Sequence, residues 1–117
     1  MVLCVPAFAL SDAKYLEWKK TSAEFRDADE SMSDSYNSCE SVLPSSDFKE
    51  IREEQREWIK SGRDKRAKEI KEEEDCSWLE AYIKATKERD YELYHYIQTY
   101  EMWYTQKYGD LPPSMKE

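Results

Sequence analysis

The sequence predicts an all-α protein, an elongated antiparallel bundle of three long helices, and three observations support this. Only two Gly and four Pro occur in 117 residues, so the chain has few places to turn. Charged residues make up 38% of the chain, as expected for well-solvated helices. Four Trp, nine Tyr and three Phe supply an aromatic core that disordered chains lack. The length suits a single domain, which we place at residues 10–117.

The first helix is predicted from Ser11 to Leu43, because apolar or small residues recur there at steps of three and four. This stripe consists of Tyr15, Trp18, Ser22, Phe25, Ala28, Met32, Tyr36, Cys39 and Leu43. Pro44 ends the helix, since proline disfavours helical geometry in the residue before it. A break near Ala28-Asp29 is the alternative.

The second helix is predicted to begin at Asp47, an N-cap with Glu50 three residues on. Its apolar stripe consists of Phe48, Ile51, Gln55, Trp58 and Gly62. Beyond Arg63 the apolar residues thin out among alternating charges, which indicates a solvated final stretch. Gly inside a helix is less favourable than Ala by about 1 kcal/mol, so a break at Ser61-Gly62 is the alternative. A break in either helix gives four or five helices.

The third helix is predicted to begin at Ser77, which forms a capping box with Glu80, and to end at Gly109. Its apolar stripe consists of Leu79, Tyr82, Ile83, Thr86, Leu93, Ile97, Tyr100 and Tyr104. Helices of roughly 30 residues are about 45 Å long, so short connections between them predict an up-down-up arrangement. Cys39 and Cys76 then lie roughly 30 Å apart by helical rise. We therefore expect no disulfide between them, and Cys4 is better placed for Cys76.

The net charge of -8 is concentrated in one part of the chain. Between Glu24 and Glu54 the sequence carries ten acidic and three basic residues. Such a surface disfavours nucleic acid and anionic lipid and favours a basic partner. The alternative is that the charge serves solubility alone.

Residues 1–9 are apolar and uncharged and close with Ala7-Phe8-Ala9, which is typical of the end of an export signal. No other run of residues is long and apolar enough to cross a bilayer. The sequence thus predicts a periplasmic or secreted protein without stable membrane insertion.

Residues that carry catalytic or metal chemistry are scarce. His95 is the only histidine, and no pattern pairs it with a nucleophile or a metal. The three cysteines lack Cys-x-x-Cys spacing, and two glycines cannot form a phosphate-binding loop. We expect no enzymatic activity, no metal and no cofactor.

Aromatic residues crowd the third predicted helix. They are Tyr91, Tyr94, Tyr96, Tyr100, Trp103, Tyr104 and Tyr108. At 100° per residue they cannot all face one direction, so some must be exposed. Tyr and Trp are enriched in recognition surfaces. The alternatives are that they cover the flanks of a thin bundle or form a dimer.

A recognisable motif lies in the middle of the chain: Gln55-Arg56, then Trp58, then Arg63-Asp64. Upstream stand Asp29, Met32 and Tyr36, and downstream Thr86, Arg89 and Leu93. With these residues, the segment from Phe25 to Leu93 resembles the family of small secreted bacterial proteins grouped with the lysozyme inhibitor LprI. Compared with that family, Gly62 looks like an insertion, and Lys65-Arg66 replaces an expected Cys.

The resemblance implies a secreted helical protein. Its motif residues here are expected to be structural, and they are Tyr36, Gln55, Arg56, Trp58, Arg63, Asp64, Thr86 and Arg89. Trp58 is expected to anchor the core, while Gln55 and Arg56 brace a neighbouring helix. Arg63 and Asp64 are expected to fix helix packing through ion pairs.

Function follows as an expectation: a secreted or periplasmic, non-enzymatic binding protein. One candidate partner is a basic lysozyme, inhibited by steric and electrostatic occlusion. The expected contact residues are Asp27, Asp29, Glu30, Asp34, Tyr100, Trp103 and Tyr104. The alternative is a structural or adaptor protein that self-associates or binds another envelope protein.

Overall fold

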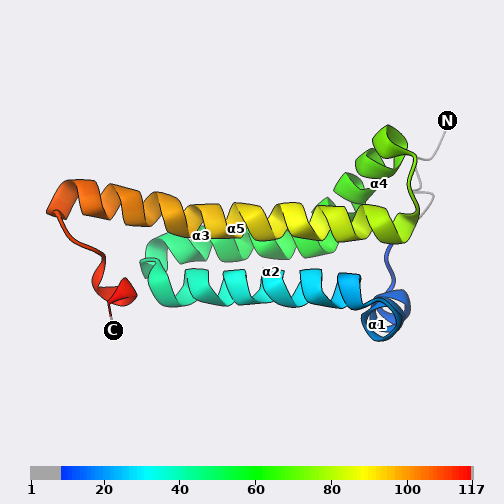
Figure 1. Cartoon of the computed structure of the whole chain (residues 1–117), viewed down its shortest axis with the longest axis horizontal. Coiled ribbons are helices and arrows are strands. Elements are labelled where there is room, and N and C mark those ends of the chain that lie inside the picture. The colour runs from blue at the N-terminus through cyan, green and yellow to red at the C-terminus, as the bar shows by residue number, and fades with distance from the viewer. Residues whose placement is uncertain (1–8, 117) are drawn as a thin grey trace.

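Helices account for every regular element of the computed structural model, which describes residues 9–116 (Figure 1). The all-α prediction is thus confirmed for this part of the chain. The elements are α1 (Asp12–Thr21), α2 (Ala23–Val42), α3 (Ser45–Glu57), the π-helical segment η1 (Trp58–Gly62), α4 (Arg63–Glu74), α5 (Trp78–Tyr108) and the 3₁₀ turn η2 (Pro113–Met115). The predicted export segment lies, apart from Ala9, outside the described residues.

The first predicted helix is two helices, and the break falls at Ser22 instead of near Ala28-Asp29. Ser22 has extended backbone angles, φ -118° and ψ 107°. Its N–H donates to the Trp18 carbonyl at 2.9 Å and ends α1. Its hydroxyl accepts from the Phe25 N–H at 3.1 Å and caps α2, a role for which Ser is well suited. The prediction of one continuous helix was therefore wrong.

The second predicted helix is continuous in backbone angles but changes type at η1. Gly62 itself is helical, with φ -63° and ψ -38°. A π turn holds one residue more than an α turn, and this segment ends at Gly62. The helix also changes direction here, and α4 leads away from the line of α3 (Figure 1). The start of α3 differs as well: it begins at Ser45, and Asp47 lies in the first turn instead of capping it.

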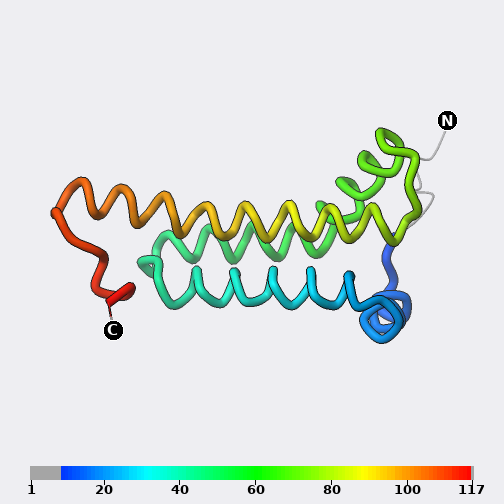
Figure 2. The backbone as a smooth tube through the Cα atoms, viewed as in Figure 1, coloured from blue at the N-terminus to red at the C-terminus, as the bar shows by residue number. Residues whose placement is uncertain are grey.

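Three helices run side by side along the long axis of the molecule, whose extents are 54 × 36 × 24 Å. α2 and α5 run in the same direction, and α3 runs against both (Figure 2). This is the up-down-up order expected from the sequence. α4 packs instead on the first turns of α5, where Arg66 donates to both carboxylate oxygens of Glu88 at 2.7 and 2.9 Å.

The core consists of two apolar clusters separated by a polar layer. The proximal cluster is Phe25, Ala67, Ile70, Ala81, Tyr82, Ile83 and Ala85. The distal cluster is Met32, Cys39, Leu43, Phe48, Ile51 and Leu93. The buried polar residues are Asp29, Gln55, Thr86 and Arg89. Asp29 lies between Phe25 and Met32 on α2, and Thr86 and Arg89 lie between Ala85 and Leu93 on α5, so the polar layer separates the two clusters along both helices.

The two described cysteines belong to different clusters. Cys39 is fully buried in the distal cluster, whereas Cys76 is partly exposed and packs against the proximal cluster. Both are free thiols. Cys4, the predicted partner of Cys76, lies outside the described residues. The Cys39 thiol donates to the Leu93 carbonyl at 3.2 Å, and burial raises its pKa to about 11.

Thiol labelling should separate these two cysteines. In a Cys4→Ser background at about pH 8, we expect a disulfide reagent to modify Cys39 on the order of 100-fold more slowly than Cys76. The Cys39 thiol is buried, and its raised pKa keeps it protonated at that pH. Single Cys39→Ser and Cys76→Ser variants assign the two rates. Equal rates would mean that α2 and α5 do not close over Cys39.

Among residues 9–116, no helix has the length and apolarity required to span a membrane.

Candidate functional site

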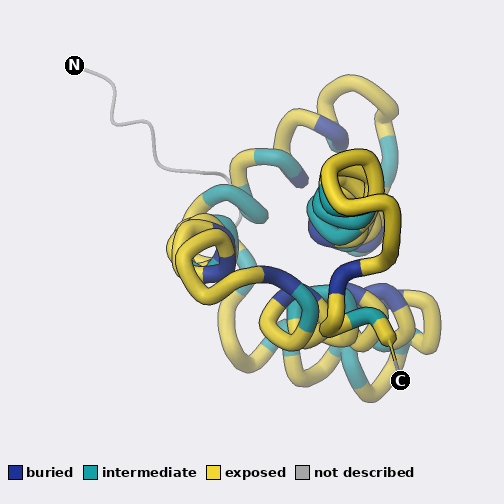
Figure 3. The backbone as a smooth tube through the Cα atoms, turned by 90° about the vertical axis from the view of Figure 1, so that its left-hand side faces the viewer, coloured by how far each residue is buried: buried dark blue, intermediate teal, exposed yellow. Residues whose placement is uncertain are grey.

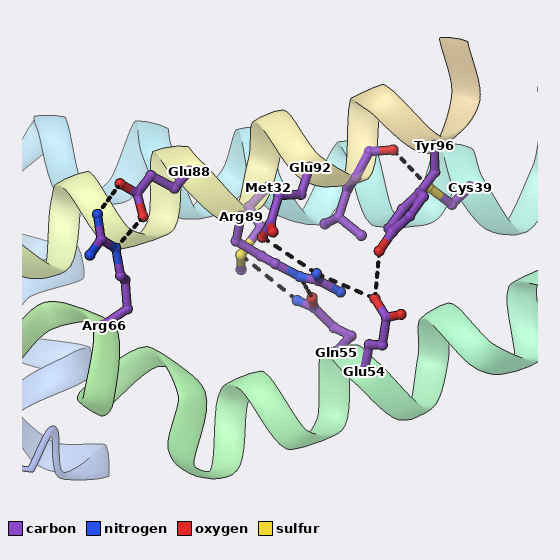
Figure 4. Close-up of polar contacts among 10 residues, drawn as sticks. Met32, Cys39, Glu54, Gln55, Arg66, Glu88, Arg89, Glu92 and Tyr96 are labelled. Carbon is purple, nitrogen blue, oxygen red and sulfur yellow. Dashed lines mark hydrogen bonds and ion pairs between the residues drawn. The ribbon is translucent and has the colours of Figure 1, made fainter. Parts of the chain in front are cut away.

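Two of the motif residues meet in the polar layer. Arg89 donates from Nε to Gln55 Oε1 at 2.7 Å (Figure 4). Its Nη1 lies 3.6 Å from a carboxylate oxygen of Glu54 and equally far from one of Glu92. Gln55 donates in turn to the Met32 sulfur at 3.7 Å. The layer therefore ties α2, α3 and α5 together at one height along the bundle.

Arg63 and Asp64 fix the packing of helices, though by contacts other than the expected ion pairs. Asp64 accepts hydrogen bonds from the Tyr82 hydroxyl at 2.5 Å and the Leu10 N–H at 3.1 Å. Burial, and then this hydrogen bond, raise the pKa of Tyr82. The Arg63 guanidinium lies over the rings of Tyr15 and Trp58, 5.7 Å from each centroid. Neither residue forms an ion pair within the part of the chain described.

The other motif residues differ in how far they are buried. Thr86 is buried and donates to the Tyr82 carbonyl at 2.8 Å, and the Tyr36 ring packs 5.3 Å from that of Phe48. Arg56 is exposed. Trp58 is only half-buried at the border of the distal cluster, so it is not the central anchor that the sequence predicted. An added Cβ at Gly62 would lie 3.3 Å from the Trp58 ring, so a larger residue at that position would require the ring to shift by a few tenths of an ångström.

One of the acidic residues predicted on α2 as a partner contact was assigned wrongly, because its side chain is buried. Asp29 is only 5% exposed. It accepts from the Tyr15 hydroxyl at 2.5 Å and lies 3.2 Å from the Lys19 ammonium. These contacts hold α1 against α2 and leave Asp29 unavailable to a partner. Asp27, Glu30 and Asp34 are exposed on the side of α2 that faces away from the core.

The three aromatic contact residues predicted on α5 do come together, in a groove at the end of the bundle. This distal groove has a volume of about 610 Å³ and lies between the start of α3 and the second half of α5. It is lined by Leu43, Pro44, Asp47, Glu50, Ile51, Glu54, Tyr96, Thr99, Tyr100, Trp103, Tyr104 and Tyr108. Figure 3 looks onto this end and shows the final turns of α5 as mostly exposed.

One wall of the distal groove is a run of aromatic rings on α5. The rings of Tyr100 and Trp103 are stacked with centroids 6.0 Å apart, and those of Tyr104 and Tyr108 lie 4.5 Å apart. Trp103 is 50% exposed and Tyr108 56% exposed. The chain after α5 folds back, and Ser114 donates to the Val42 carbonyl at 2.7 Å. This contact holds the end of the chain beside the groove.

The opposite wall of the groove was not predicted from the sequence. It carries all the charged residues that line the groove. Asp47, Glu50 and Glu54 lie on α3 at spacings of three and four residues, which places them along one stripe. Glu54 accepts a hydrogen bond from the Tyr96 hydroxyl at 2.8 Å. Burial, and then this bond, raise the pKa of Tyr96. The stripe is visible in the sequence, but only the tertiary structure brings it opposite the aromatic residues.

His95 is exposed and stacks on Tyr91, with ring centroids 6.3 Å apart. In the described region, no three His, Cys, Asp or Glu residues are grouped so that they could hold a metal ion. The geometry of the distal groove, an apolar floor with one acidic edge, is suited to binding.

Comparison of the chain with models of protein families, with curated proteins and with solved structures finds no match. The resemblance to the LprI family stays a prediction from the motif residues.

Proposed function

We propose that this chain is a periplasmic or secreted, non-enzymatic protein-binding domain, and that the distal groove is its binding site. The exposed aromatic wall of the groove carries the proposal. Trp103 and Tyr108 leave about half of their surface in water, although large apolar surfaces are normally buried. Trp and Tyr dominate binding energy at protein interfaces when a partner desolvates them. The groove is also open enough for side chains of a partner to enter.

The location outside the cytoplasm rests on residues 1–9 and on the resemblance to the LprI family. Within that proposal, a basic lysozyme is one candidate partner. Asp27, Glu30 and Asp34 give α2 an exposed acidic face that would attract a basic protein. Occlusion of the enzyme's substrate cleft would then inhibit it.

A lysis assay on bacterial cell walls tests the lysozyme candidate. No inhibition at micromolar concentrations of the chain removes lysozyme as the partner. Inhibition that does not weaken with added salt removes the electrostatic mechanism, because exposed charges are screened by salt.

A second candidate is a structural or adaptor protein that self-associates. It is favoured by a further exposed face of α5, where Tyr91 is 69% exposed, Tyr94 52% and Met102 63%. Light scattering over a range of concentrations distinguishes the two, since self-association gives a mass that rises with concentration.

Truncating Trp103 should weaken partner binding strongly. With a partner captured from the envelope fraction and then purified, we expect Trp103→Ala to raise Kd by about 30-fold or more, as for a central interface residue. Tyr91→Ala is the matched control, because it removes an exposed aromatic ring of the same helix outside the groove. Equal effects of the two substitutions on Kd would show that the groove is not the binding site.

A further inference from the structure

The partner segment that enters the distal groove can be specified from the shape and charge of its two walls. We propose that the occupant is an amphipathic α-helix of a partner protein, with an apolar face toward α5 and Lys or Arg along the edge toward α3. This inference rests on the proposed function, since it names the occupant of the same groove.

The shape of the bundle end leaves room for one more helix. α2 ends at Val42 and α3 begins at Ser45, but α5 continues past this turn to Tyr108 (Figures 1 and 2). The last turns of α5 therefore lack the helical neighbours that cover its middle, and the returning chain that leads to η2 lies beside them (Figure 1). A helix laid along this overhang would contact α5 on one side and α3 on the other, and would extend the packing of the bundle.

The length of the groove also fits a helix. By helical rise, the acidic wall from Asp47 to Glu54 covers about 10 Å and the aromatic wall from Tyr96 to Tyr108 about 18 Å. A helix of two to three turns spans such a length and presents anchors at positions i, i+3 or i+4, and i+7. A volume of about 610 Å³ accommodates the few large side chains that these anchors supply.

The charged residues that line the groove are all acidic and all lie on one helix. The lining contains three carboxylates, all on α3, and no Lys, Arg or His. Within residues 9–116 the carboxylates of Asp47 and Glu50 have no ion-pair or hydrogen-bond partner. The aromatic wall is uncharged, and Lys107 lies over Trp103 outside the lining, 5.0 Å from the ring centroid. A helix with basic residues on one edge and apolar residues beside them complements both walls.

Two designed peptides test this inference on the full chain. Both are labelled, Leu-anchored helical peptides of about 14 residues, and they differ only in carrying Lys or Glu along one edge. Fluorescence anisotropy should show the Lys peptide binding with micromolar Kd and the Glu peptide binding about tenfold more weakly or worse. The Lys peptide should also lose affinity as salt is added.

A pair of charge-matched variants locates the effect. Asp47→Asn combined with Glu50→Gln should weaken binding of the Lys peptide about tenfold. Glu72→Gln combined with Glu73→Gln removes the same charge from exposed positions of α4 outside the groove, and should change Kd by less than about twofold. Far-UV circular dichroism of both variants shows whether they are folded alike.

The outcomes separate this inference from the proposed function. Equal binding of the Lys and Glu peptides, or equal effects of the two double variants, overturns the basic helix. If Trp103→Ala still weakens binding of the native partner much more than Tyr91→Ala does, the groove remains the binding site and only its occupant was misassigned. A concentration-dependent dimer that Trp103→Ala dissociates also overturns the inference, because the occupant is then a second copy of the chain.

Discussion

Replacing Phe25 by Ala is expected to lower the free energy of unfolding by about 3–5 kcal/mol, a large part of the stability of a domain of this size. Phe25 is 1% exposed and lies at the first turn of α2. Its ring meets those of Tyr15 and Trp18 edge-on, at centroid distances of 5.8 and 5.6 Å. The substitution therefore leaves a cavity in the proximal cluster and removes the surface on which α1 packs.

Urea denaturation followed by circular dichroism measures this effect. Leu16→Ala on α1 serves as the control, because Leu16 is 59% exposed and its truncation should change stability by about 0.5 kcal/mol or less. A loss below about 1 kcal/mol for Phe25→Ala would show that α1 does not depend on this ring.

Replacing Arg89 by Met is expected to lower the free energy of unfolding by about 2–4 kcal/mol. The volume of the side chain is roughly kept, but Gln55 Oε1 loses the donor that lies 2.7 Å away. Gln55 is 6% exposed, so water does not replace that donor easily. Glu54 and Glu92 are exposed and can be solvated when the guanidinium is removed.

A double-mutant cycle identifies the polar layer as the cause. Adding Gln55→Leu to Arg89→Met should recover part of the loss, because two apolar partners cost less than one unsatisfied amide. Strictly additive effects of the two substitutions would mean that Gln55 and Arg89 are not energetically coupled.

The two ends of α5 were predicted correctly, because each is marked by a residue at the end itself. The hydroxyl of Ser77 accepts from the Glu80 N–H at 3.1 Å, as its capping box indicates. Gly109 ends α5 with φ 74°, a left-handed conformation that glycine adopts without strain. The break at Ser22 was missed, because a serine within an apolar stripe looks the same whether it continues a helix or caps the next one.

The surroundings of the proposed contact residues could be predicted from the sequence for some of them and not for others, for a physical reason. Tyr100, Trp103 and Tyr104 could be singled out because so many aromatic residues on one helix cannot all be buried. Asp29 was misassigned because its burial depends on α1 folding back to bring the Tyr15 hydroxyl to it. No local pattern reports such a contact between two helices.

The sequence by itself determined the helical class, the crowding of aromatic residues on the third predicted helix and the excess of acidic residues between Glu24 and Glu54. These depend on residue type and on spacing along one helix. Only the tertiary structure decided that η1 bends the second helix, that a polar layer divides the core, and that the Asp47 stripe faces Trp103 across a groove. Each of these depends on how separate helices pack, since side chains far apart in sequence meet only when whole helix faces are buried together.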